Sequence, residues 1–336
     1  MRPPVYVYDP TPLDVLSRVR GIGRYLQILR EVAEPHWIFT QDIKSIPTHG
    51  IFINPFINFF QYPRHIKRVT DRQIAVIHDL IGLKYPDDFP VGIKGELATW
   101  VNKQVLKSYD AIITDSETSK KDIVTMLGFT PSQVQVLYPT LPSLFWEEKQ
   151  KNQERAQGEY CIYVGDGTWN KNLCNMAHAI KKANVVAMFV GKIFESENKI
   201  SHPWQRELNE FKTLTKNDKR FIFPGFVTDF ELLKLYEQAR VNILLSRDEG
   251  FGFSYVEAAS CGCPSLLADR PVFHEISGEN AVFADPENPG EIAKKLLVFF
   301  DPHYDRGALS ENVKKRSLFF NSNSFRTSLL HIIYPV

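Results

Sequence analysis

The stretch VNILLSRDEGFGFSYVEAA, residues 241–259, decides the fold of this chain. Residues 241–245 form a short, branched and apolar run, which predicts a buried strand of a parallel sheet. Gly250 and Gly252 permit a tight turn that brings the backbone close to a ligand. A helix follows in the prediction, with Ser254 as its cap and Glu257 in its first turn.

Two carboxylates flank this predicted turn. Glu249 comes at the carboxyl end of the strand and Glu257 at the amino end of the helix. Ligands of open α/β sheets bind in this crevice, so both are candidate binding residues. Glu257 has a second interpretation, because a helix start favours an anion and the residue could serve only as a dipole partner.

Composition is typical of a globular enzyme. A chain of 336 residues is long enough for two domains with their own cores. The formal net charge of +1 gives no sign of nucleic-acid binding. We find no apolar stretch that could span a bilayer and no signal peptide, so we expect a cytoplasmic protein. Peripheral contact with the inner face of a membrane stays open, because an amphipathic surface need not alter the net charge.

The four cysteines predict small buried thiols. Cys161, Cys174, Cys261 and Cys263 lack the paired spacing of a metal site. Neither a structural zinc nor a disulfide is expected.

Strand and helix patterns alternate twice along the chain, which predicts two α/β domains with mostly parallel sheets. We expect the first domain over residues 1–145, a polar linker over 146–158 and the second domain over 159–315. The predicted strands cover residues 5–8, 51–53, 74–77, 111–114, 160–164, 185–190, 221–223, 241–245 and 264–268. The predicted helices cover residues 22–32, 92–108, 118–127, 173–182, 204–214, 230–239 and 255–260.

Three further motifs follow predicted strands. Gly21-Ile22-Gly23-Arg24-Tyr25 opens a helix whose N–H groups can hold a phosphate, or it is a plain helix start. As a dinucleotide fingerprint it is poor, because the loop before it is too long and Leu26 replaces the third small residue. His78 stands at a strand's carboxyl end, as a site residue or as an ordinary loop histidine. Lys171 stands in a strand-to-helix turn, where a cation suits a pyrophosphate, although most lysines are solvated surface residues.

Taken together, these segments resemble the family 4 glycosyltransferases, which are retaining enzymes of the GT-B fold. The most specific match is the pair Glu249 and Glu257 within Glu-Gly-Phe-Gly and Glu-Ala-Ala. Ordered matches cover nearly the whole chain, including residues 21–25, 78–80, 115–122, 163–165, 171–173, 223–229 and 283–293. The resemblance implies two Rossmann-like domains facing across a deep cleft, the first on the acceptor side and the second binding a nucleotide sugar. Residues 316–336 would form a C-terminal helix that crosses back to the first domain.

The resemblance also implies residue roles. The catalytic residues would be Glu249 at the donor hexose, Lys171 at the diphosphate and His78 near the transferred sugar. The implied donor-binding residues are Gly21 and Gly23 at the diphosphate, Phe226 and Val227 at the nucleobase, Phe251 and Gly252 through their amides, and Glu257 at the ribose.

One position departs from the family pattern. Many relatives carry an arginine where this chain has Asp166 or Asn170, which leaves Lys171 as the main cation for the diphosphate. Arg24, Lys192 and Arg247 are the candidates that could compensate.

The resemblance implies an enzyme that moves a hexose from a UDP- or GDP-sugar to a hydroxyl of a glycan or lipid-linked acceptor, in surface polysaccharide biosynthesis. Amides and a lysine can neutralise the phosphate, so neither a metal nor a cofactor is expected. Two rival classes remain: a catalytically silent relative that binds nucleotide or glycan as a partner subunit, and a nicotinamide-dependent oxidoreductase, which the poor glycine fingerprint disfavours.

Overall fold

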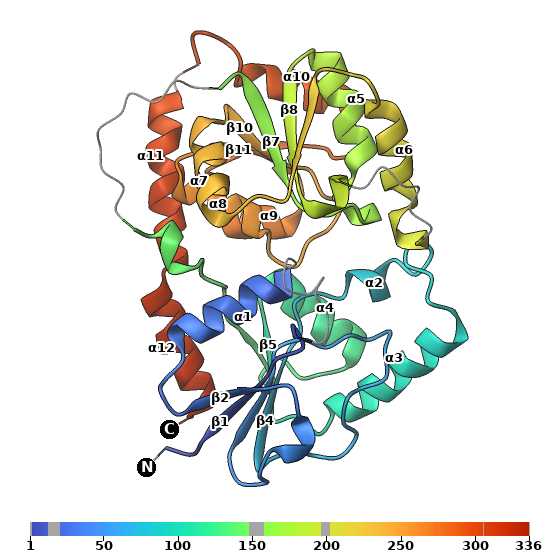
Figure 1. Cartoon of the computed structure of the whole chain (residues 1–336), viewed down its shortest axis with the longest axis vertical. Coiled ribbons are helices and arrows are strands. Elements are labelled where there is room, and N and C mark those ends of the chain that lie inside the picture. The colour runs from blue at the N-terminus through green and yellow to red at the C-terminus, as the bar shows by residue number, and fades with distance from the viewer. Residues whose placement is uncertain (1, 13–20, 148–157, 196–201, 305, 336) are drawn as a thin grey trace. The chain divides into compact units, whose positions relative to one another are not determined.

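The computed structural model describes residues 2–12, 21–147, 158–195, 202–304 and 306–335 (Figure 1). Two compact units divide the chain. The first contains Met1–Pro86, Pro90–Pro142 and Asn321–Val336, and the second contains Asp87–Phe89 and Ser143–Phe320. Residues 143–145 and 316–320 therefore group with the second unit, whereas the sequence analysis placed them outside it. Residues 148–157 of the predicted linker lie outside the described residues.

A six-stranded parallel sheet forms the centre of the first unit, in the order β2-β1-β3-β4-β5-β6. Its strands are β1 Val5–Tyr8, β2 Trp37–Thr40, β3 Ile51–Asn54, β4 Arg72–Val76, β5 Ala111–Thr114 and β6 Val134–Val136. The four predicted strands are confirmed as β1, β3, β4 and β5. The two edge strands, β2 and β6, were missed.

Helices from both ends of the chain pack in this unit. They are α1 Gly21–Val32, α2 Ile81–Lys84, α3 Gly92–Leu106, α4 Glu117–Leu127 and α12 Ser322–Ile333, with a 3-10 turn at Ile43–Ser45. Ser116 caps α4 by accepting a hydrogen bond from the Ser119 N–H at 3.0 Å. The C-terminal helix α12 is tied to this unit, because Arg72 donates to the Ile332 carbonyl at 2.9 Å.

The second unit repeats the plan with a parallel sheet in the order β12-β11-β10-β7-β8-β9. Its strands are β7 Tyr160–Val164, β8 Val186–Val190, β9 Phe221–Gly225, β10 Val241–Leu244, β11 Ser265–Ala268 and β12 Val282–Ala284. All five predicted strands are confirmed. Only the short edge strand β12 was missed.

Its helices are α5 Leu173–Ala183, α6 Arg206–Thr215, α7 Asp229–Gln238, α8 Phe253–Ser260, α9 Pro271–Ser277, α10 Pro289–Val298 and α11 Arg306–Ser317. Short 3-10 turns are η3 Ser143–Phe145, η4 Trp169–Lys171, η5 Lys192–Phe194, η6 Pro203–Gln205 and η7 Leu318–Phe320. The predicted helices correspond to α5, α6, α7 and α8. The helices α9, α10 and α11 were not predicted.

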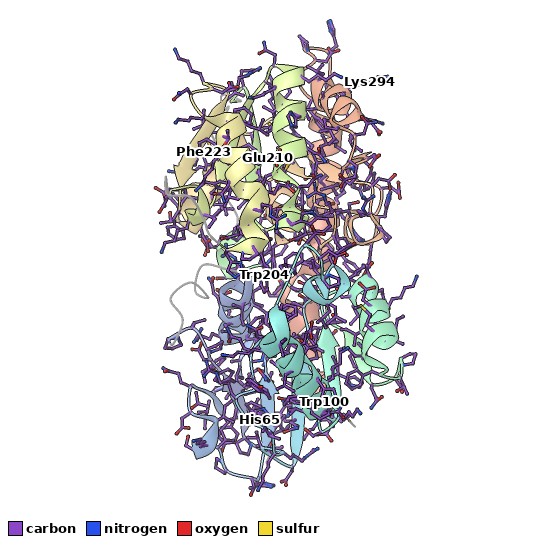
Figure 2. All side chains as sticks on the ribbon, turned by 90° about the vertical axis from the view of Figure 1, so that its right-hand side faces the viewer. His65, Trp100, Trp204, Glu210, Phe223 and Lys294 are labelled. Carbon is purple, nitrogen blue, oxygen red and sulfur yellow. The ribbon has the colours of Figure 1, made fainter. Side chains whose placement is uncertain are left out.

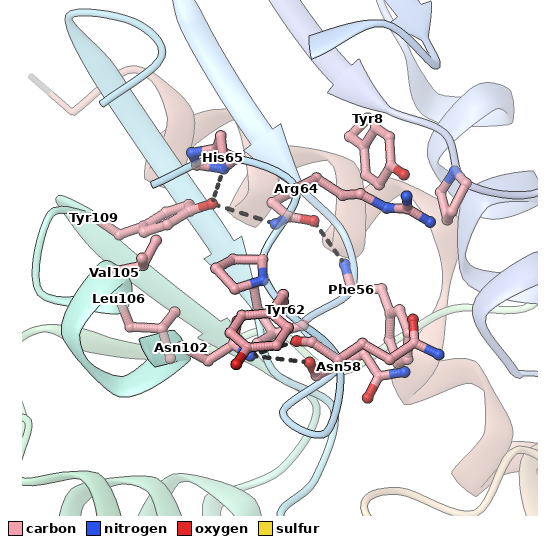
Figure 3. A pocket seen from close by; sticks show the side chains of 15 residues that line it. Tyr8, Phe56, Asn58, Tyr62, Arg64, His65, Asn102, Val105, Leu106 and Tyr109 are labelled. Carbon is pink, nitrogen blue, oxygen red and sulfur yellow. Dashed lines mark hydrogen bonds between the residues drawn. The ribbon is translucent and has the colours of Figure 1, made fainter. Parts of the chain in front are cut away.

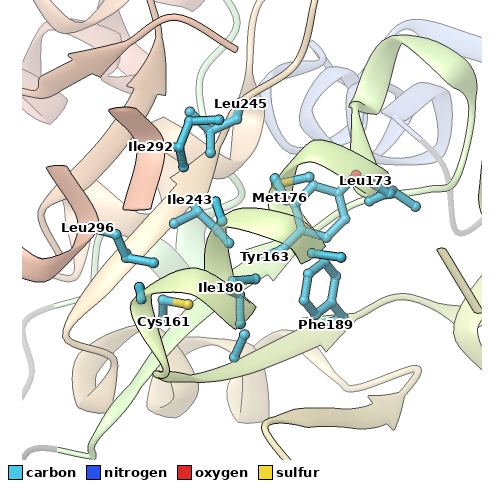
Figure 4. Close-up of a cluster of buried hydrophobic side chains, with 14 of the residues drawn as sticks. Cys161, Tyr163, Leu173, Met176, Ile180, Phe189, Ile243, Leu245, Ile292 and Leu296 are labelled. Atoms are coloured by element: carbon cyan, nitrogen blue, oxygen red, sulfur yellow. The ribbon is translucent and has the colours of Figure 1, made fainter. Parts of the chain in front are cut away.

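Side chains from the sheet and from helices α5 and α10 fill the core of this unit (Figure 4). Tyr163, Phe189 and Met176 are fully buried there, as expected for a parallel sheet covered on both faces. Cys161, Cys174 and Cys263 are buried, as predicted, whereas Cys261 is only half-buried. Within the described ranges, no helix is long and apolar enough to cross a membrane.

Candidate functional site

Lys171 and Glu249 meet at the carboxyl edge of the second sheet. Lys171 ends η4, which follows β7, and Glu249 lies in the loop after the neighbouring strand β10. Lys171 Nζ is 2.6 Å from Glu249 Oε1, and the Ser246 hydroxyl donates to the same oxygen at 2.7 Å. The side chains are only 19% and 11% exposed, respectively. Two residues predicted separately thus form one ion pair at the sheet edge where ligands of such folds bind.

The start of α8 differs from the prediction. Gly252, not Ser254, is the N-cap, with a φ of 100° and no side-chain cap. A Cβ at Gly252 would lie only 3.1–3.3 Å from Ile276, Leu244 and Phe273, so the position requires glycine. Ser254 lies two residues after the cap position, inside the helix, and its buried hydroxyl has no hydrogen-bond partner among the described residues. Because no side chain caps the helix, its first N–H groups can bind an anionic ligand.

Glu257 lies inside the second unit beneath this turn. It is the fifth residue of α8 and so belongs to the second turn, not the first as predicted. Its side chain is nearly inaccessible, since the residue is 4% exposed, and Oε2 accepts a hydrogen bond from Tyr236 of α7 at 3.1 Å. Burial raises the pKa of the Tyr236 hydroxyl well above its usual range, and the Glu257 carboxylate adds to that shift. This position argues against a role as dipole partner alone, because the dipole effect fades beyond the first turn.

The turn before Lys171 is held by polar side chains. Asp166 Oδ1 accepts hydrogen bonds from the Thr168 N–H and hydroxyl at 3.2 and 2.9 Å. Asn170 is buried and donates to the Asp248 carbonyl at 3.1 Å. The two residues that stand where relatives often carry arginine therefore fix the loop that presents Lys171. Asn172 adds a further link from a left-handed conformation, donating to the Leu245 and Pro286 carbonyls at 3.0 and 2.7 Å.

Arg247 is fully engaged within the second unit. Its guanidinium lies 2.7 Å from Glu207 and 2.9 Å from Glu287, and it stacks over the Trp169 ring at 4.8 Å. Burial raises the pKa of the Glu207 carboxyl, and Arg247 partly offsets that shift. Arg247 is thus a structural cation that braces the Lys171 loop. Lys192 differs, because it lies exposed at the first residue of η5, after β8.

The predicted nucleobase residues lie between β9 and α7. Phe226 is 56% exposed, and its N–H donates to Glu195 at 2.6 Å. Val227 is half-buried, and Thr228 begins α7 with a capping box to Glu231. An exposed ring beside a rigid helix start can stack on a planar ligand.

In the first unit, His78 is held as a cation. Its Nδ1 lies 2.7 Å from Asp115 Oδ2 and its Nε2 lies 3.0 Å from the Pro55 carbonyl oxygen. Both partners only accept, so both ring nitrogens must carry protons. Burial alone would lower the pKa of His78, but the charge and hydrogen bond of Asp115, the charge of Asp79 and the hydrogen bond to the Pro55 carbonyl together outweigh it, so the net pKa is raised above 6.5.

Gly21, Gly23 and Arg24 lie in the first turns of α1, on the same unit. Arg24 donates to Gln27 at 3.4 Å. The Tyr25 ring meets His78 edge-on, with ring centres 4.8 Å apart. The loop that precedes these residues, 13–20, lies outside the described residues.

Sequence reasoning missed the partners that hold the site residues, namely Asp115, Ser246, Tyr236 and Glu207. Asp115 could have been found, since it follows the predicted strand that comes after the strand of His78 and neighbouring parallel strands end at one sheet edge. Tyr236 gives no such signal, because nothing in a helix pattern indicates which residue of another helix its hydroxyl will reach.

Solved structures resemble the whole chain. HepE of Anabaena in complex with UDP-glucose superposes with a TM-score of 0.73 at 12% identity, covering 98% of this chain and 99% of that one. WaaG, a glycosyltransferase involved in lipopolysaccharide biosynthesis, gives 0.68 at 14% identity over 99% and 100%. At these identities the likeness shows the fold, and the expected two-domain GT-B architecture is confirmed.

Curated relatives have a higher sequence identity to this chain but cover less of it. The O-antigen chain mannosyltransferase RfbU of Salmonella typhimurium is 25% identical over 240 residues, covering 67% of this chain and 60% of the relative. The O-antigen chain mannosyltransferase B of Escherichia coli is 23% identical over 68% of this chain and 61% of its own length. This chain thus spans about three-fifths of the length of these relatives.

The family model described as glycosyl transferases group 1 matches residues 145–316, just over half of the chain. Those residues contain the Lys171–Glu249 pair, the start of α8 and Glu257. This chain therefore belongs to the group 1 glycosyl transferases.

Proposed function

We propose that this chain transfers a hexose, with mannose as the first candidate, from a UDP- or GDP-sugar to a hydroxyl of a glycan or lipid-linked acceptor in surface polysaccharide biosynthesis. The transfer retains the anomeric configuration and needs no metal. The Lys171–Glu249 ion pair is the observation that carries the proposal. The names of the O-antigen relatives support the choice of sugar and acceptor class.

Lys171 neutralises the leaving diphosphate. Charge builds on that group as the glycosidic bond breaks, so a fixed cation stabilises the transition state more than the ground state. Glu249 and the buried loop of Asn170 set the position of the ammonium group in advance. The uncapped N–H groups of α8 add neutralisation without a divalent ion.

Glu249 also holds the donor hexose. Both hydrogen bonds that the described residues make to its carboxylate go to Oε1, which leaves Oε2 to accept from a sugar hydroxyl. Glu257 binds the ribose hydroxyls, and Phe226 with Val227 borders the base. His78 places a positive charge at the carboxyl edge of the first sheet, where the transferred sugar is expected. A lipid-linked acceptor would bring the chain to the inner face of a membrane.

Donor hydrolysis by the purified chain tests the proposal. Incubation with GDP-mannose and, separately, UDP-glucose should release the nucleoside diphosphate slowly, as water replaces the acceptor. Proton NMR of the released sugar, recorded before mutarotation, should show the α anomer of the donor. Release of the β anomer would contradict retention. Nucleotide binding with neither hydrolysis nor transfer would favour a silent partner subunit instead.

A further inference from the structure

A cavity lies within the first unit, and none of the residues assigned to the donor is among those that line it. It encloses about 320 Å³ and is lined from the end of β1, from residues 54–65 and from the last turns of α3 (Figure 3). This volume is at the lower end of the range for small-molecule sites. We propose that it binds a sugar ring of a glycan, and the choice of a glycan among hydroxyl-rich ligands rests on the proposed function.

One wall of the cavity is built by an internal hydrogen-bond chain. Asn54 Nδ2 lies 3.3 Å from the Tyr109 hydroxyl, which lies 2.9 Å from His65 Nε2. His65 Nδ1 is 3.1 Å from the Lys67 carbonyl, so it donates there and Nε2 accepts from Tyr109. Burial lowers the pKa of His65, which favours the neutral ring. A neutral ring can accept a hydrogen bond at Nε2, as this arrangement of hydrogen bonds requires. These groups are satisfied by one another and hold the wall in place.

The loop that carries the opposite wall is tied to α3. The side-chain amide of Asn102 donates to the carbonyls of Asn58 at 3.2 Å and Gln61 at 2.8 Å. It also reaches the Ala98 carbonyl at 2.9 Å within the helix. A single buried amide thus fixes the loop backbone, so the cavity is preformed.

Other polar groups of the lining face the cavity without partners. Among the described residues, no hydrogen bond is made by the hydroxyls of Tyr8 and Tyr62, the Arg64 guanidinium or the Asn58 side-chain N–H. Figure 3 shows the Arg64 side chain extending along the pocket toward Tyr8. Polar groups at a protein surface that are not used internally can be satisfied by water or by a ligand.

Their chemistry matches a sugar. Tyr62 is 55% exposed and Phe56 is also exposed, and such aromatic faces can cover the C–H face of a pyranose. Amide, hydroxyl and guanidinium groups can exchange hydrogen bonds with ring hydroxyls. The lining contains no carboxylate, so it favours a neutral or acidic sugar over a cationic ligand.

Saturation-transfer difference NMR tests the proposal with methyl α-D-mannopyranoside, α-1,2-mannobiose and D-glucuronate as probes. GDP and UDP are added at saturating concentration, so that any sugar held at the donor site is displaced. At least one probe should keep its signals. Tyr62→Ala and Arg64→Ala should each weaken its binding by about tenfold, a typical loss for one stacking or hydrogen-bonding contact. Tyr8→Phe, which removes only a hydroxyl, should weaken it less.

Matched controls are Trp100→Ala and Lys94→Ala, which alter exposed residues of the same helix outside the lining (Figure 2). These should leave binding unchanged. Three results would overturn the proposal. No probe gives signals, the signals disappear when nucleotide is added, or all variants bind the probe equally. Donor hydrolysis does not use this cavity. Tyr62→Ala should therefore still hydrolyse the donor. If the sugar probes do not bind but donor hydrolysis persists, only the proposed sugar site is refuted. If a sugar probe binds but the chain does not hydrolyse a donor, only the proposed function is refuted.

Discussion

Lys171 Nζ and Glu249 Oε1, from two neighbouring strand-to-helix connections of the second unit, lie 2.6 Å apart. The Ser246 hydroxyl donates to the same Glu249 oxygen, and buried Asn170 fixes the loop that carries Lys171. In the proposed mechanism, Lys171 binds the diphosphate of the donor, and its contact with Glu249 fixes the position of the ammonium group before the donor binds. The two residues should behave as one functional unit.

Replacing either member should abolish most turnover. Glu249→Ala should lower kcat roughly a hundredfold or more, on the order of 3 kcal/mol, and Lys171→Ala should do the same. The fold-decrease in kcat of the double variant should be much smaller than the product of the two single-variant decreases, because each single variant already removes the same ion pair. Steady-state rates with GDP-mannose measure this. Glu210→Ala, an exposed residue of α6 in the same unit, is the matched control (Figure 2). A decrease in kcat for the double variant equal to the product of the two single-variant decreases would argue against a coupled pair.

Glu257 should control affinity for the nucleotide more than rate. Glu257→Gln keeps the shape of the buried side chain but weakens its hydrogen bonds to ribose, so the Kd for GDP should rise about tenfold or more. Tyr236→Phe removes the partner hydroxyl and serves as the control for an effect on packing alone. Isothermal titration measures the Kd for GDP of both variants. An unchanged Kd for Glu257→Gln would contradict the proposal that Glu257 binds the ribose.

The charge of His78 should make the first unit pH-sensitive. Because its folded pKa is raised above 6.5, protonation contributes stability that is fully present below pH 6.5 and is lost as pH rises through the folded pKa. The difference in unfolding free energy between wild type and His78→Gln should therefore shrink as pH rises from 6 to higher values. NMR titration of the ring in Asp115→Asn should show a lower pKa than in wild type. Equal values would contradict the assigned cause.

Removal of Arg247 should destabilise the second unit. Arg247→Ala leaves Glu207 buried without its cation, at a cost of roughly 2–4 kcal/mol. Thermal unfolding should shift down by about 2–4 °C for each kcal/mol. Arg206→Ala, an exposed arginine at the first residue of α6, should leave the midpoint unchanged. A loss of activity in Arg247→Ala without any loss of stability would instead place this arginine at the diphosphate.

Chelation tests the metal-free mechanism. Lys171 and the start of α8 are proposed to neutralise the phosphates, so excess EDTA should leave the rate of donor hydrolysis within about twofold of the untreated rate. As a control, Mn²⁺ is added in excess over the EDTA, which should also leave the rate within about twofold. A rate that falls to background with EDTA and returns with Mn²⁺ would contradict the proposal.

Much of the fold follows from the sequence because its central strands are buried on both faces. Residues 160–164 are a continuous apolar run and form β7, and residues 241–245 are apolar except for Asn242 and contain β10. The missed strands lie at sheet edges, where Trp37–Thr40 has only one buried residue and Val282–Ala284 has only three residues. Helix α11 carries too few apolar residues to show a buried face.

The candidate site was predicted residue by residue but not as a set of contacts. Glu249 and Lys171 were each expected at a strand's carboxyl end, yet their pairing depends on β10 lying beside β7, which is a long-range property of the sheet. The cap was misplaced because a serine at position 254 is a good cap by type. The left-handed backbone of Gly252 starts the helix earlier and overrides that preference.

Isothermal titration with GDP-mannose and UDP-glucose tests the central claim most directly, using wild type, Lys171→Met and Glu210→Ala. The account predicts that one of these donors binds wild type and Glu210→Ala alike, at one site per chain. Lys171→Met should weaken that binding at least tenfold, because the diphosphate loses its fixed cation. Binding of neither donor to wild type, or equal binding by Lys171→Met, would contradict the account.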